Sequence, residues 1–208
     1  VVGEKNICDI GEFIKSLKNT KKVSLITGSN VKKIVQKKIE KSLSASKIEN
    51  VWHLTKTNDI KSINDIEKKV HKNKSDLIIG VGGGRSVDIA KMIGFNLDRP
   101  FVSIPTSASH DGIASPFVSV KGDKPHSLVA TAPLGVFVDV DIIKKAPRKL
   151  LASGCGDLIA KITAVRDWQL GRDKTGEYYG RYSADLALMS AKILMENSTR
   201  FSKKGLDV

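Results

Sequence analysis

The sequence is short of cysteine and of long apolar runs. Only two cysteines occur among its 208 residues, Cys8 and Cys155, and they form neither a disulfide framework nor a paired-cysteine metal motif. No apolar stretch approaches the length of a membrane span, and the N-terminus shows no apolar signal region. We therefore expect a protein of the reducing cytoplasm that does not insert into a membrane.

Aromatic residues are also scarce, at 5% of the chain, although the net charge is +13. A charge of this size can indicate nucleic-acid binding. The lysines, however, are scattered over expected helix faces between Lys15 and Lys74, and no basic run alternates with aromatic residues as a stacking platform requires. We expect no nucleic-acid partner and keep a polyanion-binding domain as the distant alternative. The excess charge could also attract phosphorylated substrates.

What the first half does contain is an alternation of short apolar runs and helical patterns. Strands are predicted at Val23–Ile26, Val51–Leu54, Leu77–Val81 and Phe101–Ile104. Helical spacing relates Val31, Ile34, Val35, Ile39 and Leu43, and a second helix that starts near Ser62 has Ile63, Ile66 and Val70 on its buried face. Because parallel strands need such crossovers, we predict an α/β fold with a Rossmann-like parallel sheet and helices on both faces.

The rest of the chain has a different character. The segment 121–125 separates Pro116–Val120 from Ser127–Ala130 as in a hairpin, and Gly135–Val138 is predicted as a further strand. Helices are predicted at Asp157–Leu170 and at roughly Arg181–Asn197. We predict an α/β nucleotide-binding domain at residues 1–146 and an all-helical domain at residues 147–208, truncated here because the chain stops soon after a helix.

The strongest local signal lies at the end of a predicted strand, where parallel sheets bind their ligands. The run GVGGGRSVDIAK at 80–91 follows the third strand and opens a helix. Gly82, Gly83 and Gly84 let backbone N–H groups approach a pyrophosphate, and the helix N-terminus adds its dipole and free donors. The run departs from the GxGxxG fingerprint, and glycine-rich turns also serve packing alone. The order of strand, glycines and helix favours phosphate binding.

Two weaker signals lie downstream. The run PTSASHDG at 105–112 directly follows a strand and offers hydroxyl groups that suit phosphate, ribose or amide, although such runs are also common in turns. The run SGCGDLIAK at 153–161 places Asp157 where a helix is predicted to begin. From spacing alone, Asp157 is interpreted as a carboxylate that caps this helix.

Taken together and in this order, GGGRSVDIAK, PTSASHDG and SGCGDLIAK resemble the iron-containing alcohol dehydrogenase/dehydroquinate synthase-like superfamily. That superfamily joins an N-terminal nucleotide-binding domain to a C-terminal helical domain. The Arg-Ser after the glycines and the TSASHDG loop look most like the archaeal sn-glycerol-1-phosphate dehydrogenase family, and the resemblance covers nearly the whole chain. It implies reduction of dihydroxyacetone phosphate to sn-glycerol 1-phosphate with NADH or NADPH, for the backbone of archaeal membrane phospholipids.

The resemblance also implies site residues, position by position. Two positions match single contacts in the family. Asp111 matches a substrate-binding aspartate, and Asp157 matches the aspartate that binds the metal and lies beside the substrate. Cofactor-binding positions are matched by Gly84, Arg85, Ser86, Val87 and Asp88 in one segment, by Thr106, Ser107, Ala108 and Ser109 in a second loop, and by Ser115.

The metal implied by the resemblance is zinc, which would polarise the ketone while the nicotinamide delivers a hydride to the carbonyl carbon. The family takes two histidine ligands from helical-domain positions beyond Val208. None of His53, His71, His110 and His126 matches them, and the first two are expected at the surface or at a strand end. Because one carboxylate cannot hold a catalytic zinc, we expect the chain as written to bind cofactor better than it catalyses.

Several alternatives stay open. Glycerol dehydrogenase or a non-redox relative of dehydroquinate synthase would share these motifs, and a non-catalytic partner domain is a third reading. Lys56, after the second predicted strand, could accept a 2′-phosphate, and no acidic group near it demands NAD. We therefore predict use of both cofactors or a preference for NADPH. The resemblance favours a homo-oligomer.

Overall fold

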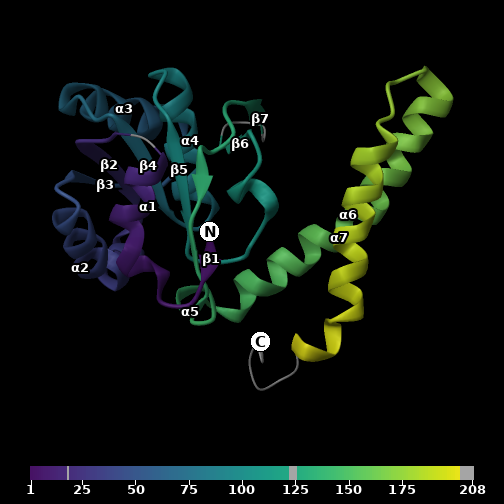
Figure 1. Cartoon of the computed structure of the whole chain (residues 1–208). Coiled ribbons are helices and arrows are strands. Elements are labelled where there is room, and N and C mark those ends of the chain that lie inside the picture. Colours follow the sequence, from purple (N-terminus) through teal and green to yellow (C-terminus); the bar gives the residue numbers. More distant parts are fainter. Residues whose placement is uncertain (18, 122–125, 202–208) are drawn as a thin grey trace. The chain divides into compact units, whose positions relative to one another are not determined.

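The computed structural model describes residues 1–17, 19–121 and 126–201, and their contacts separate into two compact units (Figure 1). The first unit comprises residues 1–108 and 112–146. The second comprises residues 109–111 and the chain from residue 147 onward. No helix in the described ranges is long and apolar enough to span a bilayer.

A five-stranded parallel sheet forms the centre of the first unit. Its strands lie in the order β3-β2-β4-β5-β8, and each neighbouring pair is parallel. The predicted α/β fold is therefore confirmed. The strands are β2 (Lys22–Thr27), β3 (Glu49–Leu54), β4 (Leu77–Gly82), β5 (Phe101–Pro105) and β8 (Gly135–Val136), and the crossover helices are α2 (Ser29–Ala45), α3 (Ile60–Asn73) and α4 (Gly84–Asn96).

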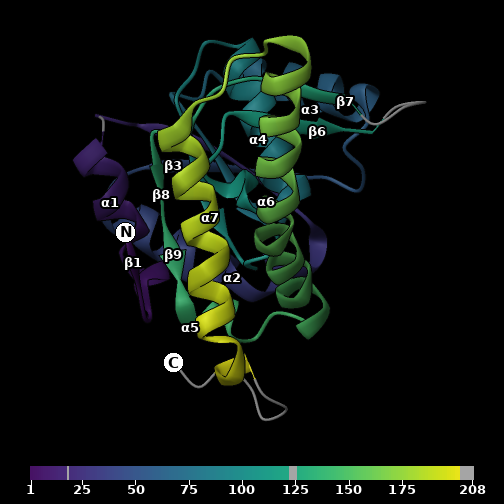
Figure 2. The same ribbon diagram turned by 90° about the vertical axis from the view of Figure 1, so that its right-hand side faces the viewer.

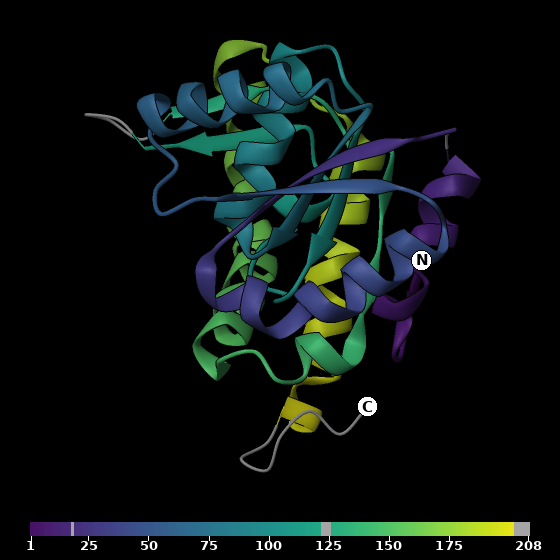
Figure 3. The ribbon, with the colours of Figure 1, turned by 90° about the vertical axis from the view of Figure 1, so that its left-hand side faces the viewer.

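Apolar side chains cover both faces of this sheet, as expected for parallel strands between helices. Figure 3 shows the helices on both sides of the strands. One face packs against α2 and α1 (Ile10–Leu17), and the other packs against α3 and α4. Strand β4 shows the alternation of the pleat, because Leu77 and Ile79 belong to the core on the α2 side and Ile78 belongs to the core on the α4 side.

Helix α3 begins earlier than the sequence predicts. Asp59 is its N-cap, and the carboxylate accepts a hydrogen bond from the Ser62 N–H at 2.8 Å. The helix therefore starts at Ile60, and Ser62 lies within its first turn. The predicted buried face is confirmed for Ile63, Ile66 and Val70.

Helix α2 differs from its prediction at one position. Val35, Ile39 and Leu43 are buried as expected, whereas Ile34 is 66% exposed. Residue 34 lies about 100° around the helix axis from residue 35, which takes its side chain off the buried stripe.

The segment predicted as one strand at Gly135–Val138 is divided between two sheets. β8 pairs with β5, whereas β9 (Val138–Asp139) pairs with β1 (Val2–Gly3) in a separate two-stranded sheet. Phe137 lies between them, and its buried ring packs on Phe13 with 4.7 Å between ring centroids. The single-strand prediction is wrong because the pairing partner changes at Phe137.

Smaller elements complete the first unit. The predicted hairpin is present as antiparallel strands β6 (Phe117–Val120) and β7 (His126–Val129), and residues 122–125 of its connection lie outside the described residues. Short helices are η1 (Asn6–Asp9), η2 (Asp111–Ile113, which starts in the other unit) and α5 (Val140–Ile143).

The second unit is a pair of helices that run side by side in opposite directions, α6 (Arg148–Thr175) and α7 (Arg181–Glu196), followed by η3 (Ser198–Phe201) (Figure 2). Helix α6 begins at Arg148, directly after Pro147, which cannot extend the helix backwards. Asp157 therefore lies inside α6, and its interpretation as a helix cap is wrong. The glycines of the SGCG run are accommodated within the helix.

Candidate functional site

The order of the strands defines a switch point between β2 and β4. Taken in chain order, the five strands are arranged 2-1-3-4-5, so the chain leaves the sheet centre in opposite directions at this position. Doubly wound folds of this order bind nucleotides at the carboxyl ends of the strands that flank the switch point. The loop after β2 is open here, because Ser29 and Asn30 are exposed and a Cβ atom on Gly28 would meet no atom within 4 Å.

The glycine run after β4 lies at the same switch point, and its glycines have different tasks. A Cβ atom on Gly80 would come within 2.9 Å of the Val87 Cα atom, so this glycine allows α4 to pack closely on β4. Gly82 has φ +147°, which L side chains rarely adopt. At Gly83 a Cβ atom would make only an ordinary contact with Ser107 Oγ, at 3.4 Å. Packing within the protein therefore does not explain the glycine at position 83. The missing side chain instead leaves space outside the protein surface.

The N-terminus of α4 offers unused hydrogen-bond donors. No side chain caps this helix, and the N–H groups of Ser86 and Val87 donate to the Gly83 carbonyl oxygen at 3.1 and 3.3 Å. Within the described parts of the chain, no acceptor meets the N–H groups of Gly83, Gly84 and Arg85. Three free donors at the positive end of a helix dipole are suited to an anion such as a phosphate group.

The loop after β5 lies beside the glycine turn. Pro105 pairs with Gly82 in the sheet register, and the Thr106 N–H donates to the Gly82 carbonyl oxygen at 3.0 Å. Ser107 is buried against the turn, Thr106 is half-buried and Ala108 is exposed. The structure therefore brings together the first two predicted cofactor segments within the first unit.

Arg85 brings a third loop to this edge. Its Nη1 atom donates to the Lys56 carbonyl oxygen at 2.5 Å, and both side chains are exposed. Lys56 follows β3, so the loop after that strand lies next to the first turn of α4. This hydrogen bond joins the loop after β3 to the first turn of α4.

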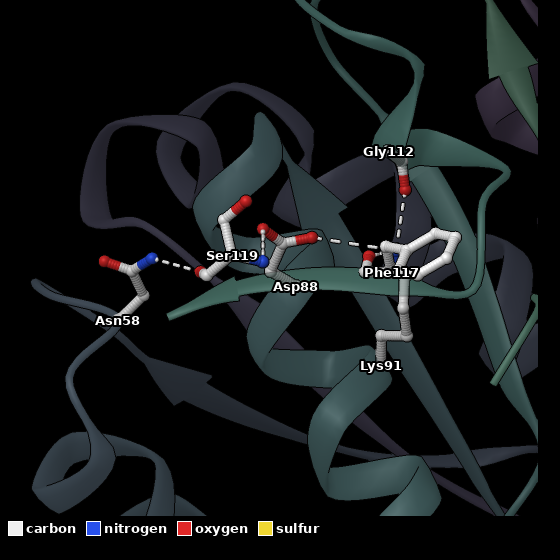
Figure 4. A network of polar contacts seen from close by, with 6 residues as sticks. All are labelled: Asn58, Asp88, Lys91, Gly112, Phe117 and Ser119. Atoms are coloured by element: carbon white, nitrogen blue, oxygen red, sulfur yellow. Dashed lines mark hydrogen bonds and ion pairs between the residues drawn. The ribbon is translucent and has the colours of Figure 1, made fainter. Parts of the chain in front are cut away.

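Two predicted cofactor residues point into the protein. Val87 has no exposed surface and belongs to the core between the sheet and α3. Asp88 is 7% exposed; it accepts a hydrogen bond from the Ser119 N–H at 3.2 Å and pairs with Lys91 Nζ at 3.7 Å (Figure 4). The Val87 side chain thus packs in the core, and the Asp88 side chain binds the backbone of β6. Ser115 is half-buried in the segment that leads into β6.

In the second unit, the structure brings Asp111 and Asp157 together. The Asp111 N–H donates to Asp157 Oδ2 at 2.9 Å, and Lys161 Nζ donates to the Asp111 carboxylate. The hydrogen bond to Asp111 raises the pKa of Lys161, and the negative charges of Asp111 and Asp157 add to this shift. Ser109 also belongs to this unit and is buried.

The zinc implied by the resemblance does not fit the residues present. The described ranges contain no group of three or more histidine, cysteine, aspartate or glutamate side chains that could hold a metal ion. The Asp111 N–H donates to Asp157, and the Lys161 ammonium group is paired with the carboxylate of Asp111. A catalytic zinc site takes three protein ligands, which this pair does not provide.

His53 is buried at the carboxyl end of β3, so of its two expected positions, at the surface or at a strand end, the second is confirmed. It lies near the end of β3, and its Nε2 atom is 3.1 Å from Ser24 Oγ, which in turn lies 2.9 Å from Ser75 Oγ. Burial lowers the pKa of His53, and the charge of Lys69 lowers it further. His71 is exposed, as predicted.

Sequence reasoning misses two lysines that contact the predicted aspartates. Lys91 lies three residues after Asp88, and Lys161 lies four residues after Asp157. Residues at these spacings meet on one face of a helix. The spacing was therefore a usable signal for Lys91. Lys161 pairs with Asp111, which lies far from it in the sequence, so helical spacing gives no signal for that contact.

Comparisons with known proteins agree on one family. The family model described as iron-containing alcohol dehydrogenase matches residues 1–147. A curated relative from Nitrosopumilus maritimus is 66% identical over the whole chain, and one from Cenarchaeum symbiosum is 60% identical. Both are named glycerol-1-phosphate dehydrogenase (NAD(P)+), and the chain spans 58% of the length of each.

Solved structures share the fold at low sequence identity. Glycerol dehydrogenase from Schizosaccharomyces pombe has a TM-score of 0.83 and 23% identity, over 95% of this chain and 52% of its own. NADH-dependent butanol dehydrogenase A from Thermotoga maritima has a TM-score of 0.81 and 20% identity, over 100% of this chain and 56% of its own. At this level of identity the similarity concerns the fold alone.

Proposed function

The chain belongs to the iron-containing alcohol dehydrogenase family, and we propose that it carries the cofactor-binding part of a glycerol-1-phosphate dehydrogenase. Such an enzyme would reduce dihydroxyacetone phosphate to sn-glycerol 1-phosphate with NAD(P)H. The observation that carries the proposal is the open N-terminus of α4 at the switch point of the sheet. The names of the relatives support the substrate. The product would supply the backbone of archaeal phospholipids.

The residues at the switch point fit a dinucleotide. The N–H groups of Gly83, Gly84 and Arg85 would hold its pyrophosphate, and the missing side chain of Gly83 leaves the space that this close approach requires. The bound nicotinamide supplies the hydride that the reduction needs. The remaining proposed cofactor contacts are Gly82, Ser86, Thr106, Ser107, Ala108, Ser109 and Ser115, with Val87 and Asp88 acting through the packing of α4.

The cofactor is proposed to be either NADH or NADPH, with a preference for NADPH. Arg85 donates to the Lys56 carbonyl oxygen, and both residues have exposed side chains, so a 2′-phosphate, the part of NADPH that cations recognise, is proposed to bind there. A strict requirement for NADH would contradict this preference.

Asp111 and Asp157 are proposed to contact the substrate. A carboxylate accepts hydrogen bonds from hydroxyl groups. Dihydroxyacetone phosphate and sn-glycerol 1-phosphate both carry a hydroxyl group on the carbon next to the reacting one. Zinc at Asp157 stays an expectation from the resemblance, because the described residues do not complete its ligands.

The test of this function uses the full-length protein. Reduction of dihydroxyacetone phosphate, followed as oxidation of NADPH or NADH, is expected, with little or no reduction of dihydroxyacetone. Oxidation of glycerol without activity on either phosphorylated compound would show a glycerol dehydrogenase instead. Binding of NADPH by the 208-residue chain separates the cofactor part of the proposal from the substrate part.

A cytoplasmic homo-oligomer is also proposed for the enzyme. Both cysteines are free thiols in the structure, which suits a reducing compartment. The oligomer rests on the family resemblance, and light scattering of the full-length protein tests it.

A further inference from the structure

Lys91, in α4, has a side chain with no exposed surface. Lysine is almost never fully buried unless its charge is paired, because an ammonium group loses strong hydration when it leaves water. An apolar side chain of similar length would fill the same space without this cost. The burial of Lys91 therefore needs a reason beyond packing.

The ammonium group of Lys91 is surrounded by acceptors from one neighbouring segment and from its own helix. It donates to the carbonyl oxygens of Gly112 at 2.8 Å and Phe117 at 2.6 Å, and Asp88 Oδ1 lies 3.7 Å away (Figure 4). Gly112 and Phe117 stand at the two ends of residues 113–116. Lys91 thus clamps both ends of the short segment that contains Ser115.

Asp88 extends the same connection to the hairpin. Its Oδ2 atom accepts the Ser119 N–H at 3.2 Å, and the Ser119 carbonyl oxygen accepts Asn58 Nδ2 at 2.7 Å. Apolar contacts of Val118 and Val120 also hold β6 in the core on the α4 side. Those contacts have no preferred direction, whereas the hydrogen bonds fix the position of individual backbone atoms along α4.

We propose that Lys91, paired with Asp88, is a positioning residue that holds segment 112–117 and its Ser115 in a fixed place relative to the pyrophosphate-binding N-terminus of α4. This inference rests on the proposed function, because it assumes that both regions contact one dinucleotide. Lys91 lies about 9 Å along the helix from Arg85, at 1.5 Å per residue, so it acts through the segment that it holds and does not touch the phosphates. Helix α4 carries both Lys91, which holds segment 112–117, and the N-terminus that is proposed to bind the pyrophosphate. A shift of the segment along α4 therefore changes its distance from the bound pyrophosphate.

The test combines a local and a functional measurement on the 208-residue chain. In Lys91→Met, the amide hydrogens of residues 112–119 should exchange faster, and the Kd for NADPH should rise by roughly tenfold to a hundredfold, as misplacement of a binding group by about 1 Å can cause. The control is Leu43→Ala, which removes a fully buried side chain of α2 from the core on the opposite face of the sheet. Its stability should fall while its Kd for NADPH stays at the wild-type value.

Asp88→Asn gives a second, milder variant that keeps an acceptor for the Ser119 N–H and removes the charge that pairs with Lys91. Asp88→Asn should raise the Kd for NADPH by less than Lys91→Met does. If Lys91→Met does not fold, Asp88→Asn alone tests the positioning role. An unchanged Kd in the folded lysine or aspartate variant, or an equal rise in Leu43→Ala, overturns the inference and leaves the proposed function standing. Failure of the wild-type chain to bind NADPH contradicts the proposed cofactor site itself, and the positioning role falls with it.

Discussion

At the scale of the residue, the lysines of this chain fall into different classes despite their uniform appearance in the sequence. Lys72 is exposed on α3, Lys56 is exposed next to Arg85, and Lys91 is completely buried. The net charge of +13 therefore says little about function by itself. The neighbours of each lysine decide its task.

Lys56→Gln should reduce the affinity for NADPH by roughly tenfold and leave the affinity for NADH unchanged, because hydrogen bonds to a charged group contribute about 1.5–3 kcal/mol and only NADPH carries the 2′-phosphate. Titration of the chain with each dinucleotide measures both constants. Lys72→Gln is the matched control, since it removes the same charge from a site away from the switch point. An equal loss for NADH and NADPH in Lys56→Gln would show that Lys56 does not recognise the 2′-phosphate.

His53 should make the fold less stable in mild acid. Burial lowers its pKa below the usual value of 6.5, so the unfolded chain takes up the proton first as the pH falls. The free energy of unfolding is unaffected by His53 above that value and decreases as the pH falls through it towards the pKa in the folded protein.

Urea unfolding at several pH values, between neutrality and the onset of carboxylate titration, measures this effect. The wild type should lose more stability over that interval than His53→Gln, which keeps a polar group near Ser24 and cannot titrate. Parallel curves for the two proteins would mean that His53 contributes nothing to the pH dependence.

At the scale of the element, the turn between β4 and α4 combines a packing task with a binding task. Gly82→Ala should destabilise the fold by roughly 1–3 kcal/mol, because φ is +147° there and the new Cβ atom would lie 2.9 Å from Ser86 Oγ. Gly83→Ala should leave stability nearly unchanged and weaken NADPH binding, since its Cβ atom meets protein only at 3.4 Å but fills the space in front of the free donors.

Thermal unfolding and NADPH titration of both variants separate the two tasks. If Gly83→Ala binds NADPH as tightly as wild type, the pyrophosphate does not bind at this turn. A Gly82→Ala protein with wild-type stability would show that the turn relaxes easily.

The elements of the first unit could be predicted because local pattern and tertiary packing agree there. Leu77–Val81 is apolar throughout, as a strand covered on both faces must be, and Ile63, Ile66 and Val70 follow the helical period. The predictions fail where a distant contact decides the structure. Phe137 ends one strand by its burial against Phe13, and α6 continues through glycines that predict a break.

The candidate site shows the same division. The glycine turn could be predicted because its chemistry is local: a strand, three glycines and a helix in sequence. The contact between Asp111 and Asp157 joins residues far apart in the chain, and only the resemblance suggested a common role for them. The clamp of Lys91 on Gly112 and Phe117 uses backbone carbonyl groups, which every residue has and which leave no trace in the sequence.

At the scale of the whole molecule, the two units differ in how much apolar surface they bury. The first unit has apolar cores on both faces of its sheet. In the described part of the second unit, the buried apolar side chains are Val165, Ala184, Ala191 and Leu194. One face of α7 leaves larger apolar side chains exposed, at Tyr182, Leu186, Met189 and Ile193, which follow helical spacing.

This difference predicts unequal local stability in the 208-residue chain. Amide hydrogens of α6 and α7 should exchange at least about a hundredfold faster than those of β2, β4 and β5, because a helix pair with few buried apolar contacts opens without unfolding the sheet. Hydrogen exchange followed by mass spectrometry measures both regions in one sample. Val165→Ala serves as an internal check: it should accelerate exchange in the helices further and leave the strands unchanged, since the buried Val165 belongs to the second unit. Equal protection of α6 and β4 would mean that the two units open together, and that the few buried side chains of the helix pair understate what stabilises it.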